Sequence, residues 1–146
     1  MITVTRERQL RRPISELWQL LANPHNLPRI LPQIARVEVS EPTSDSQPLT
    51  AYFDFGAHLG TQAAQGTFST IEQQSIRFEA EQPLPIVAHW QLHPNANSTK
   101  VHASLSFDLK PILGPAAKVV PISMVKNEIT RELEQALRRI ERLALS

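Results

Sequence analysis

The sequence predicts an α+β protein in which a curved antiparallel sheet of about seven strands packs against one long helix at the carboxyl end. Two small helices are expected directly after the first strand. This prediction rests on the spacing of apolar residues, which becomes alternating at Ile34, stays so for roughly seventy-five residues and then becomes helical again. Pro13 and Pro115 stand near the boundaries of these regions.

The first part of the chain predicts one strand and two short helices. Residues 2–12 alternate between apolar and polar side chains, which is typical of a half-buried strand. Pro13 ends this strand and can stand at the start of a helix, and apolar residues at helical spacing continue to Asn23. Three prolines within residues 24–32 leave room for no more than a short helical turn.

Six further strands are predicted after Ile34, because each segment alternates in polarity and turn sequences separate them. A polar loop is expected over residues 41–48 and a turn at Pro94–Asn97. Strands of this kind form an antiparallel sheet with one apolar face. The predicted strands are 34–39, 51–59, 66–72, 75–80, 86–92 and 101–109.

One long amphipathic helix is predicted from about Pro121 to the end of the chain, or from Pro115 with a kink at Pro121. It is the only predicted element that is long enough to cover the apolar face of the sheet. Because one helix does not fill a strongly curved sheet completely, a cavity is expected between them. The apolar stripe of the helix consists of Val125, Ile129, Leu133, Leu137, Ile140 and Ala144.

Length and composition fit a single globular domain over residues 1–146, since 41% of the residues are hydrophobic and 20% are charged. Because 15 Lys and Arg residues balance 14 Asp and Glu residues, we expect no nucleic-acid partner. The absence of cysteine excludes disulfides, thiolate nucleophiles and cysteine-ligated metal sites. No apolar run is long enough to span a membrane and no secretion signal is recognisable, so we expect a cytoplasmic protein.

Residues 12–24 resemble the entrance to the first helix of the START/Bet v 1-like superfamily, which includes polyketide cyclase and coenzyme Q-binding-protein types. Its members carry a proline, a tryptophan shortly after it, and then Asp-Pro or Asn-Pro. Here these are Pro13, Trp18 and the Asn-Pro pair that ends the segment. Residues 27–39 are similar to the second helix and second strand of that superfamily. The resemblance implies a helix-grip fold over the whole chain.

The predicted function is the binding or transport of a hydrophobic small molecule, of the lipid, quinone or polyketide type, in the cavity between sheet and helix. The resemblance implies this class of function, because members of the superfamily include lipid and sterol carriers, hormone receptors and cyclases. Two alternatives stay open: an enzyme similar to polyketide cyclases and dehydratases, or an interaction module without a cavity. The almost entirely apolar inward positions of the best-defined strands weaken the enzymatic alternative. We predict no cofactor.

Aromatic side chains on the predicted inner face are the candidate ligand contacts. A concave, mostly apolar site with a few polar groups is how proteins hold small hydrophobic ligands. For any single one of these residues packed core is the better interpretation, and the resemblance favours a cavity only for the set. Met124 on the long helix could close the space. The candidates are Phe53, Phe55, Phe68, Phe78, Trp90 and Phe107.

Three charged residues are also predicted to face inward. Arg6 and Arg8 share the parity of Val4, and Glu72 shares that of Phe68. A buried guanidinium must be paired, because an uncompensated charge in the interior is costly. One hypothesis is that Arg6 and Arg8 anchor a carboxylate, phosphate or quinone oxygen of the ligand. The alternative is an ion pair with Glu72 or a helix carboxylate, or exposure at the edge of the sheet.

His89 and His102 are predicted to lie almost opposite each other on neighbouring strands and to face outward. Two imidazoles so placed could bind zinc, but no third ligand at a fixed spacing accompanies them, and no metal site is predicted. The sequence also lacks Gly-x-Ser-x-Gly, a glycine-rich phosphate loop and His-Glu-x-x-His.

The mouth of the cavity is predicted between the proline-rich segments 24–32 and 111–121 and the loop at Gly56–Gly60. The alternative is that the leucines of the first segment are ordinary core residues. Exposed mouth residues could touch a membrane or a donor protein transiently. The residues expected to be exposed there are Leu27, Leu31 and Ile112.

Overall fold

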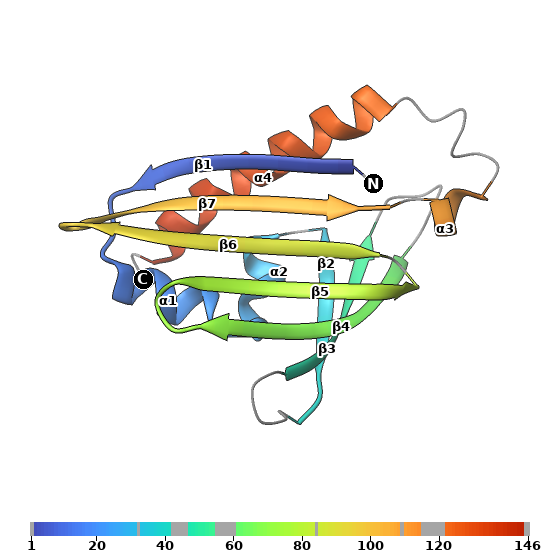
Figure 1. Cartoon of the computed structure of the whole chain (residues 1–146), viewed down its shortest axis with the longest axis horizontal. Coiled ribbons are helices and arrows are strands. Elements are labelled where there is room, and N and C mark those ends of the chain that lie inside the picture. Colours follow the sequence, from blue (N-terminus) through green and yellow to red (C-terminus); the bar gives the residue numbers. More distant parts are fainter. Residues whose placement is uncertain are drawn as a thin grey trace.

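An antiparallel sheet crossed by a long carboxyl-terminal helix dominates the structure (Figure 1). The computed structural model describes residues 2–31, 33–41, 47–54, 61–83, 85–108, 110–114 and 122–144. Within them, seven strands form one sheet in the order β1-β7-β6-β5-β4-β3-β2. The strands are β1 (Ile2–Leu10), β2 (Ile34–Val39), β3 (Gln47–Asp54), β4 (Thr61–Ile71), β5 (Ser75–Pro83), β6 (Ile86–Asn95) and β7 (Ser98–Phe107). The helices are α1 (Ile14–Leu21), η1 (Pro24–Asn26), α2 (Leu27–Ile30), α3 (Lys110–Leu113) and α4 (Ile122–Leu143).

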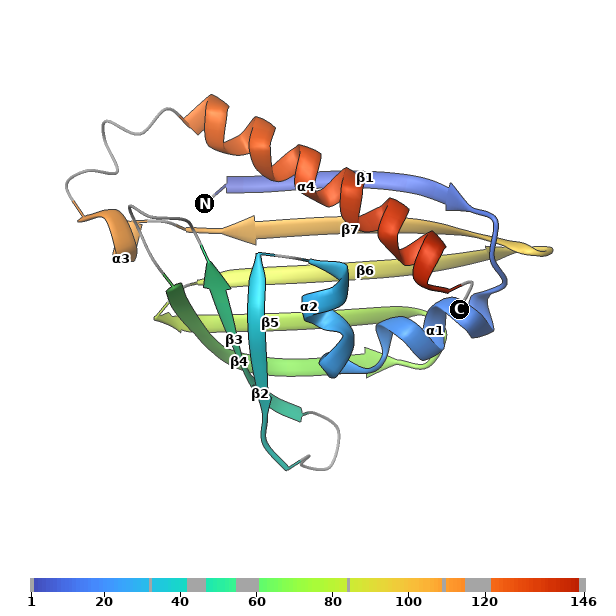
Figure 2. The same cartoon turned by 180° about the vertical axis from the view of Figure 1, so that it is seen from behind.

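The predicted α+β architecture is therefore confirmed, including the short helices after the first strand and the long final helix. Strands β2 to β6 each pair with the strand that follows in sequence, whereas β1 pairs with β7 across the whole chain. This leaves β1 and β2 at the two edges of the sheet. The helix α4 lies across β1 and β7, and α1 and α2 lie on the same face of the sheet (Figure 2).

The polar loop before β3 is shorter than predicted. We predicted this loop over residues 41–48, but β3 already begins at Gln47 and its residues pair with β4. Residues 55–59 and Leu109, which are predicted to lie in strands, are outside the described residues. Alternation alone did not show the start of β3, because its first two residues, Gln47 and Pro48, are not strongly apolar.

Strand β4 begins at Thr61, five residues before the predicted strand 66–72. The early part was missed because residues 62–65 read Gln-Ala-Ala-Gln, which shows no alternation of large apolar side chains. The pairing with β5 shifts register between Gln65 and Gly66, as in a β-bulge. A Cβ atom at Gly66 would lie 2.1 Å from the carbonyl oxygen of Glu79. Glycine is therefore required where the two backbones approach each other.

Prolines stand at the starts of the short helices. Pro13 precedes α1 in an extended conformation, with φ −67° and ψ 153°, and its carbonyl oxygen accepts the backbone N–H of Glu16 at 3.2 Å. Leu27 is 6% exposed and Leu31 is 8% exposed, so both are core residues. The prediction that they are exposed at a mouth is wrong, because the helical turn of α2 points them inward. The side chain of Ile112 lies outside the described residues.

The carboxyl-terminal half of α4 is fixed to the sheet by apolar packing and two hydrogen bonds. The Glu134 carboxylate accepts a hydrogen bond from Arg6 Nε at 2.9 Å. The Glu141 carboxylate accepts one from the backbone N–H of Arg11 at 2.9 Å. Both partners belong to β1 or directly follow it. The buried residues of this half of the helix are Leu133, Ala136, Leu137 and Ile140.

Candidate functional site

The inner face of the sheet is apolar and carries the predicted aromatic residues. The alternation of the sequence assigned these side chains to the correct face, because the strands are regular over these segments. Phe55 lies outside the described residues. The predicted aromatic residues that are described, all of them buried, are Phe53, Phe68, Phe78, Trp90 and Phe107.

The centre of this inner face is less buried than its surroundings. Ala88 on β6 and Leu105 on β7 are register partners on the inner face, and both are only half-buried. Their same-face neighbours along each strand are fully packed. Those buried neighbours are Ile86, Trp90, Ala103 and Phe107. Solvent therefore reaches an apolar spot in the middle of the face that α4 crosses.

The amino-terminal half of α4 is packed less tightly than the rest of the helix. Val125 and Ile129 belong to its apolar stripe and pack against the core, yet both are only half-buried. We call Ala88, Leu105, Val125 and Ile129 the accessible patch. All four side chains are apolar, so the patch exposes hydrocarbon without offering a charged group.

One polar side chain on the inner face was missed by the sequence analysis. Gln62 has the parity of the buried residues Ala64 and Phe68, is half-buried, and lies opposite Phe53 in the register of β3 and β4. It makes a polar or electrostatic interaction of its own. A prediction that β4 begins at Thr61 would have placed Gln62 on the inner face. The sequence gives a weaker indication for Ala88, which is a small residue between the large residues Ile86 and Trp90 on the same face of the strand.

Arg6 and Arg8 lie on the helix side of the sheet, as their parity predicts, but neither is deep. The Arg6 side chain is 46% exposed and is paired with Glu134, whose side chain is 45% exposed. Arg8 is also exposed. The expectation that both lie deep in the cavity is therefore wrong, because β1 is an edge strand whose inward side chains reach solvent beside α4. Arg6 instead forms the ion pair with a helix carboxylate that was the alternative, at the exposed edge of the sheet. A contact of either with a ligand stays a prediction.

Two other predicted site residues do not face a cavity. Glu72 lies in the turn between β4 and β5 and is exposed, because β4 ends at Ile71 and its alternation ends there. Met124 is 67% exposed on α4 and does not close the space. It precedes the apolar stripe of the helix at Val125 by one position, which turns its side chain outward.

The outer face of the sheet carries a charged and histidine-containing network. Glu7 on β1 accepts from Lys100 Nζ at 3.4 Å and lies 3.4 Å from His102 Nδ1 on β7. The hydrogen bonds of His102 and Lys100 hold the pKa of the Glu7 carboxyl below its usual value. Burial lowers the pKa of His89, and the charges of Arg77 and His102 lower it further.

The prediction that His89 and His102 lie almost opposite each other is wrong. The hairpin between β6 and β7 turns at Ala96–Asn97, so that His89 pairs with Ser104 and His102 pairs with Gln91. The two imidazoles are therefore offset by two residues. No cluster of three potential metal ligands occurs within the part of the chain that the structure describes.

The antiparallel sheet, the long helix across its inner face and the short helices after the first strand define a helix-grip domain. The chain belongs to the family described as polyketide cyclase / dehydrase and lipid transport, which it matches over residues 1–141. The resemblance to the START/Bet v 1-like superfamily is thereby confirmed. No helix among the described residues is both long and apolar enough to cross a membrane.

Solved structures share the fold at low sequence identity. TTHA0849 from Thermus thermophilus is 18% identical, with a TM-score of 0.77 over 99% of this chain and 97% of its own. The Zhui aromatase/cyclase from Streptomyces sp. R1128 is 15% identical, with a TM-score of 0.75 over 98% and 93%. The STAR-related lipid transfer protein from Xanthomonas axonopodis is 13% identical, with a TM-score of 0.73 over 99% and 86%. No curated protein matches the chain.

Proposed function

We propose that the protein binds a hydrophobic small molecule of the lipid, quinone or polyketide type between its sheet and α4, and carries it without converting it. The observation that carries this proposal is the accessible patch. Ala88 and Leu105 keep exposed apolar surface in the middle of the inner face, although their same-face neighbours along β6 and β7 are packed. The family description, which names lipid transport beside cyclase and dehydrase activity, supports the same class of ligand.

The chemistry of the patch favours a ligand that is apolar over most of its length. Covering apolar surface stabilises a complex by about 25 cal/mol per Å². Water that meets Ala88 and Leu105 gains no hydrogen bond from either side chain, so a hydrocarbon chain or ring displaces it favourably. Gln62, half-buried on the same face, is the described side chain that could receive a polar end group.

Carriage is favoured over catalysis by the polar groups of the described interior. Thr99 is the buried polar residue among them, and its hydroxyl donates to the carbonyl oxygen of Arg12 at 2.9 Å. General acid–base chemistry needs a titratable group within hydrogen-bond reach of the substrate. Apart from Arg6 and Arg8 at the exposed edge, the described inner face offers Gln62, whose amide does not titrate.

The test is a titration with oleic acid, followed by the emission of Trp90 in a Trp18→Phe background. Trp90 lies beside Ala88 on the same face of β6, so a ligand on the patch changes its surroundings. Ala88→Phe fills the patch and is expected to weaken binding by at least roughly tenfold, because the ring occupies the ligand's volume. Val87→Phe adds the same ring to the outer face of the same strand and should leave binding unchanged.

Equal affinity in the Ala88→Phe and Val87→Phe proteins would place the ligand elsewhere and overturn the proposal. Mass spectrometry of compounds that co-purify with the wild-type protein provides the second readout. Recovery of a hydrophobic compound from wild type and Val87→Phe, but not from Ala88→Phe, is the expected result. Product formation from a bound polyketide would instead support the enzymatic alternative.

A further inference from the structure

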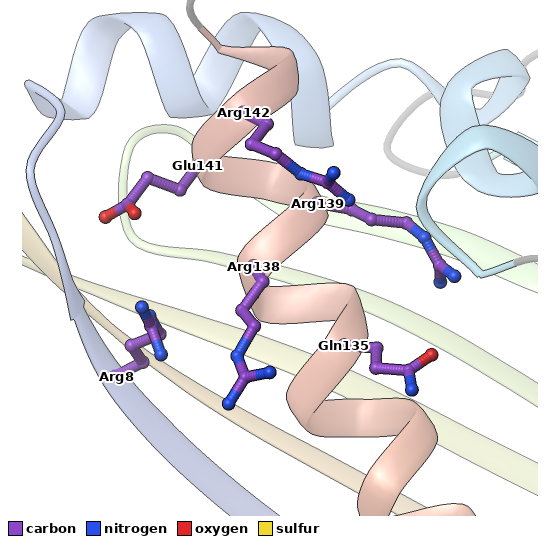
Figure 3. A pocket seen from close by; sticks show the side chains of 6 residues that line it. All are labelled: Arg8, Gln135, Arg138, Arg139, Glu141 and Arg142. Atoms are coloured by element: carbon purple, nitrogen blue, oxygen red, sulfur yellow. The ribbon is translucent and has the colours of Figure 1, made fainter.

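A concave site lies on the carboxyl-terminal half of α4 (Figure 3), and none of its lining residues belongs to the accessible patch. Its volume of about 450 Å³ is in the range of small-molecule sites. One lining side chain comes from β1 and the others come from α4. We call this site the arginine groove. It is lined by Arg8, Gln135, Arg138, Arg139, Glu141 and Arg142.

The arginine groove has an unbalanced positive charge. Four guanidinium groups face one carboxylate, and the Glu141 carboxylate already accepts the backbone N–H of Arg11 at 2.9 Å. None of the four guanidinium groups forms an ion pair within the described residues. The chain as a whole carries a net charge of only +1, so this excess is local.

A comparison within β1 separates the groove from ordinary surface arginines. Arg6 and Arg8 lie two residues apart on the same face of the strand. Arg6 is paired with Glu134 at 2.9 Å, and this pair joins β1 to α4. Arg8 reaches the same helix but has no carboxylate partner among the described residues. Its charge is therefore available to a ligand.

One donor of the groove is buried and lacks an acceptor among the described residues. It is Nη1 of Arg139, which is inaccessible to solvent and has no hydrogen-bond partner in that part of the chain. Buried donors in folded proteins nearly always have an acceptor, because an unsatisfied one costs free energy. An anion would supply that acceptor once the Arg139 side chain turns this donor toward the groove.

The helix dipole explains part of this arrangement. Arginines in the last turns of a helix interact favourably with the partial negative charge at its carboxyl end. That effect accounts for Arg138, Arg139 and Arg142 as helix residues. It does not account for Arg8, which comes from β1, or for the unsatisfied donor of Arg139.

The guanidinium groups divide into two sets. Arg138 extends from α4 toward the side of Arg8, whereas Arg139 and Arg142 leave the helix on its other side (Figure 3). Guanidinium groups bind phosphate oxygens through paired hydrogen bonds, and they do so better than ammonium groups. Two sets on opposite sides of the exposed face of α4 suit an anion that spans this face and carries more than one phosphate group.

The geometry points to the arginine groove as a binding site for a ligand with two or more phosphate groups, independent of the hydrophobic ligand. The phosphates could belong to a soluble polyphosphorylated compound or to the headgroups of an anionic lipid surface, since the chemistry of recognition is the same.

The experiment is calorimetric titration of the full chain with tripolyphosphate and with orthophosphate at low salt. Vesicles of phosphatidylcholine, with and without phosphatidylglycerol, form a second arm. Arg8→Gln/Arg138→Gln removes one charge from each of the two elements. Lys126→Gln/Arg131→Gln removes the same charge from exposed positions of α4 outside the groove and is the matched control. Circular dichroism verifies that each variant is folded.

Saturable binding of tripolyphosphate, tighter than that of orthophosphate, is expected for wild type and control. The groove variant should bind at least roughly tenfold more weakly, because two charge-assisted contacts are lost. Binding only to vesicles with phosphatidylglycerol, with the same dependence on the variants, would identify a lipid headgroup as the source. Equal loss in both variants would show unspecific charge attraction and overturn the proposal, as would the absence of binding in both arms.

Discussion

Gly66 is the position where the sheet tolerates a side chain least. A Cβ atom there would lie 2.1 Å from the carbonyl oxygen of Glu79, which is backbone and cannot rotate away. Gly66→Ala must therefore separate β4 from β5 at the bulge, at a cost of about 1–3 kcal/mol or more, as for other overpacked sites. Urea denaturation monitored by circular dichroism gives this free energy of unfolding.

Thr67→Ala is the matched control for this prediction, because Thr67 is the exposed neighbour of Gly66 on the same strand. We expect a change within about 0.5 kcal/mol for it, as for ordinary surface substitutions. Similar free energies for the two variants would mean that the strands separate without cost, contrary to the close backbone approach.

Individual residues also show what alternation can and cannot predict. The period of two assigned Phe78, Trp90 and Phe107 to the buried face, because that face is set by local backbone geometry. It placed Arg8 on the correct side but not at the correct depth. Depth depends on the neighbours of a strand, and the sequence does not show that β1 is an edge strand whose partner is β7.

Among the elements, α4 is the one whose two halves differ most. Leu137 is buried in the half that is fixed to β1, and Met124 is 67% exposed in the other half. Leu137→Ala should lower the free energy of unfolding by about 2–5 kcal/mol, because it leaves a cavity in the core. Met124→Ala should change it by less than about 0.5 kcal/mol.

Both values come from urea denaturation of the full chain. A large loss of stability in Met124→Ala would mean that its side chain packs against another part of the molecule. That result would contradict the weak attachment of the amino-terminal half of α4, on which the position of the accessible patch depends.

The helices and most strands could be predicted because their periodicity is strong over many residues. The stripe from Val125 to Ile140 repeats at helical spacing and predicted a helix from about Pro121 to the end of the chain, where α4 spans Ile122–Leu143. The first half of β4 could not be found in this way, since small and polar residues dominate it. The offset between His89 and His102 was missed because it depends on which two residues form the turn, here Ala96 and Asn97.

At the scale of the whole molecule, the two proposed sites use opposite halves of one helix. The accessible patch involves Val125 and Ile129, whereas the arginine groove involves residues 135–142. The pairs Arg6–Glu134 and Arg11–Glu141 fix the second half to β1 whatever occupies the first. A ligand in one site should therefore leave the other site unchanged.

This independence predicts additive stabilisation. Oleic acid at a free concentration of about 100 times its Kd should raise the free energy of unfolding by about 2.7 kcal/mol, and tripolyphosphate at the same ratio should do likewise. Together they should give the sum of the separate effects within about 0.5 kcal/mol. Urea denaturation without ligand, with each ligand alone and with both ligands together measures the separate and the combined free energies of stabilisation. A combined effect that differs from the sum by more than about 1 kcal/mol would show that α4 couples the two sites, because independent sites have no interaction free energy.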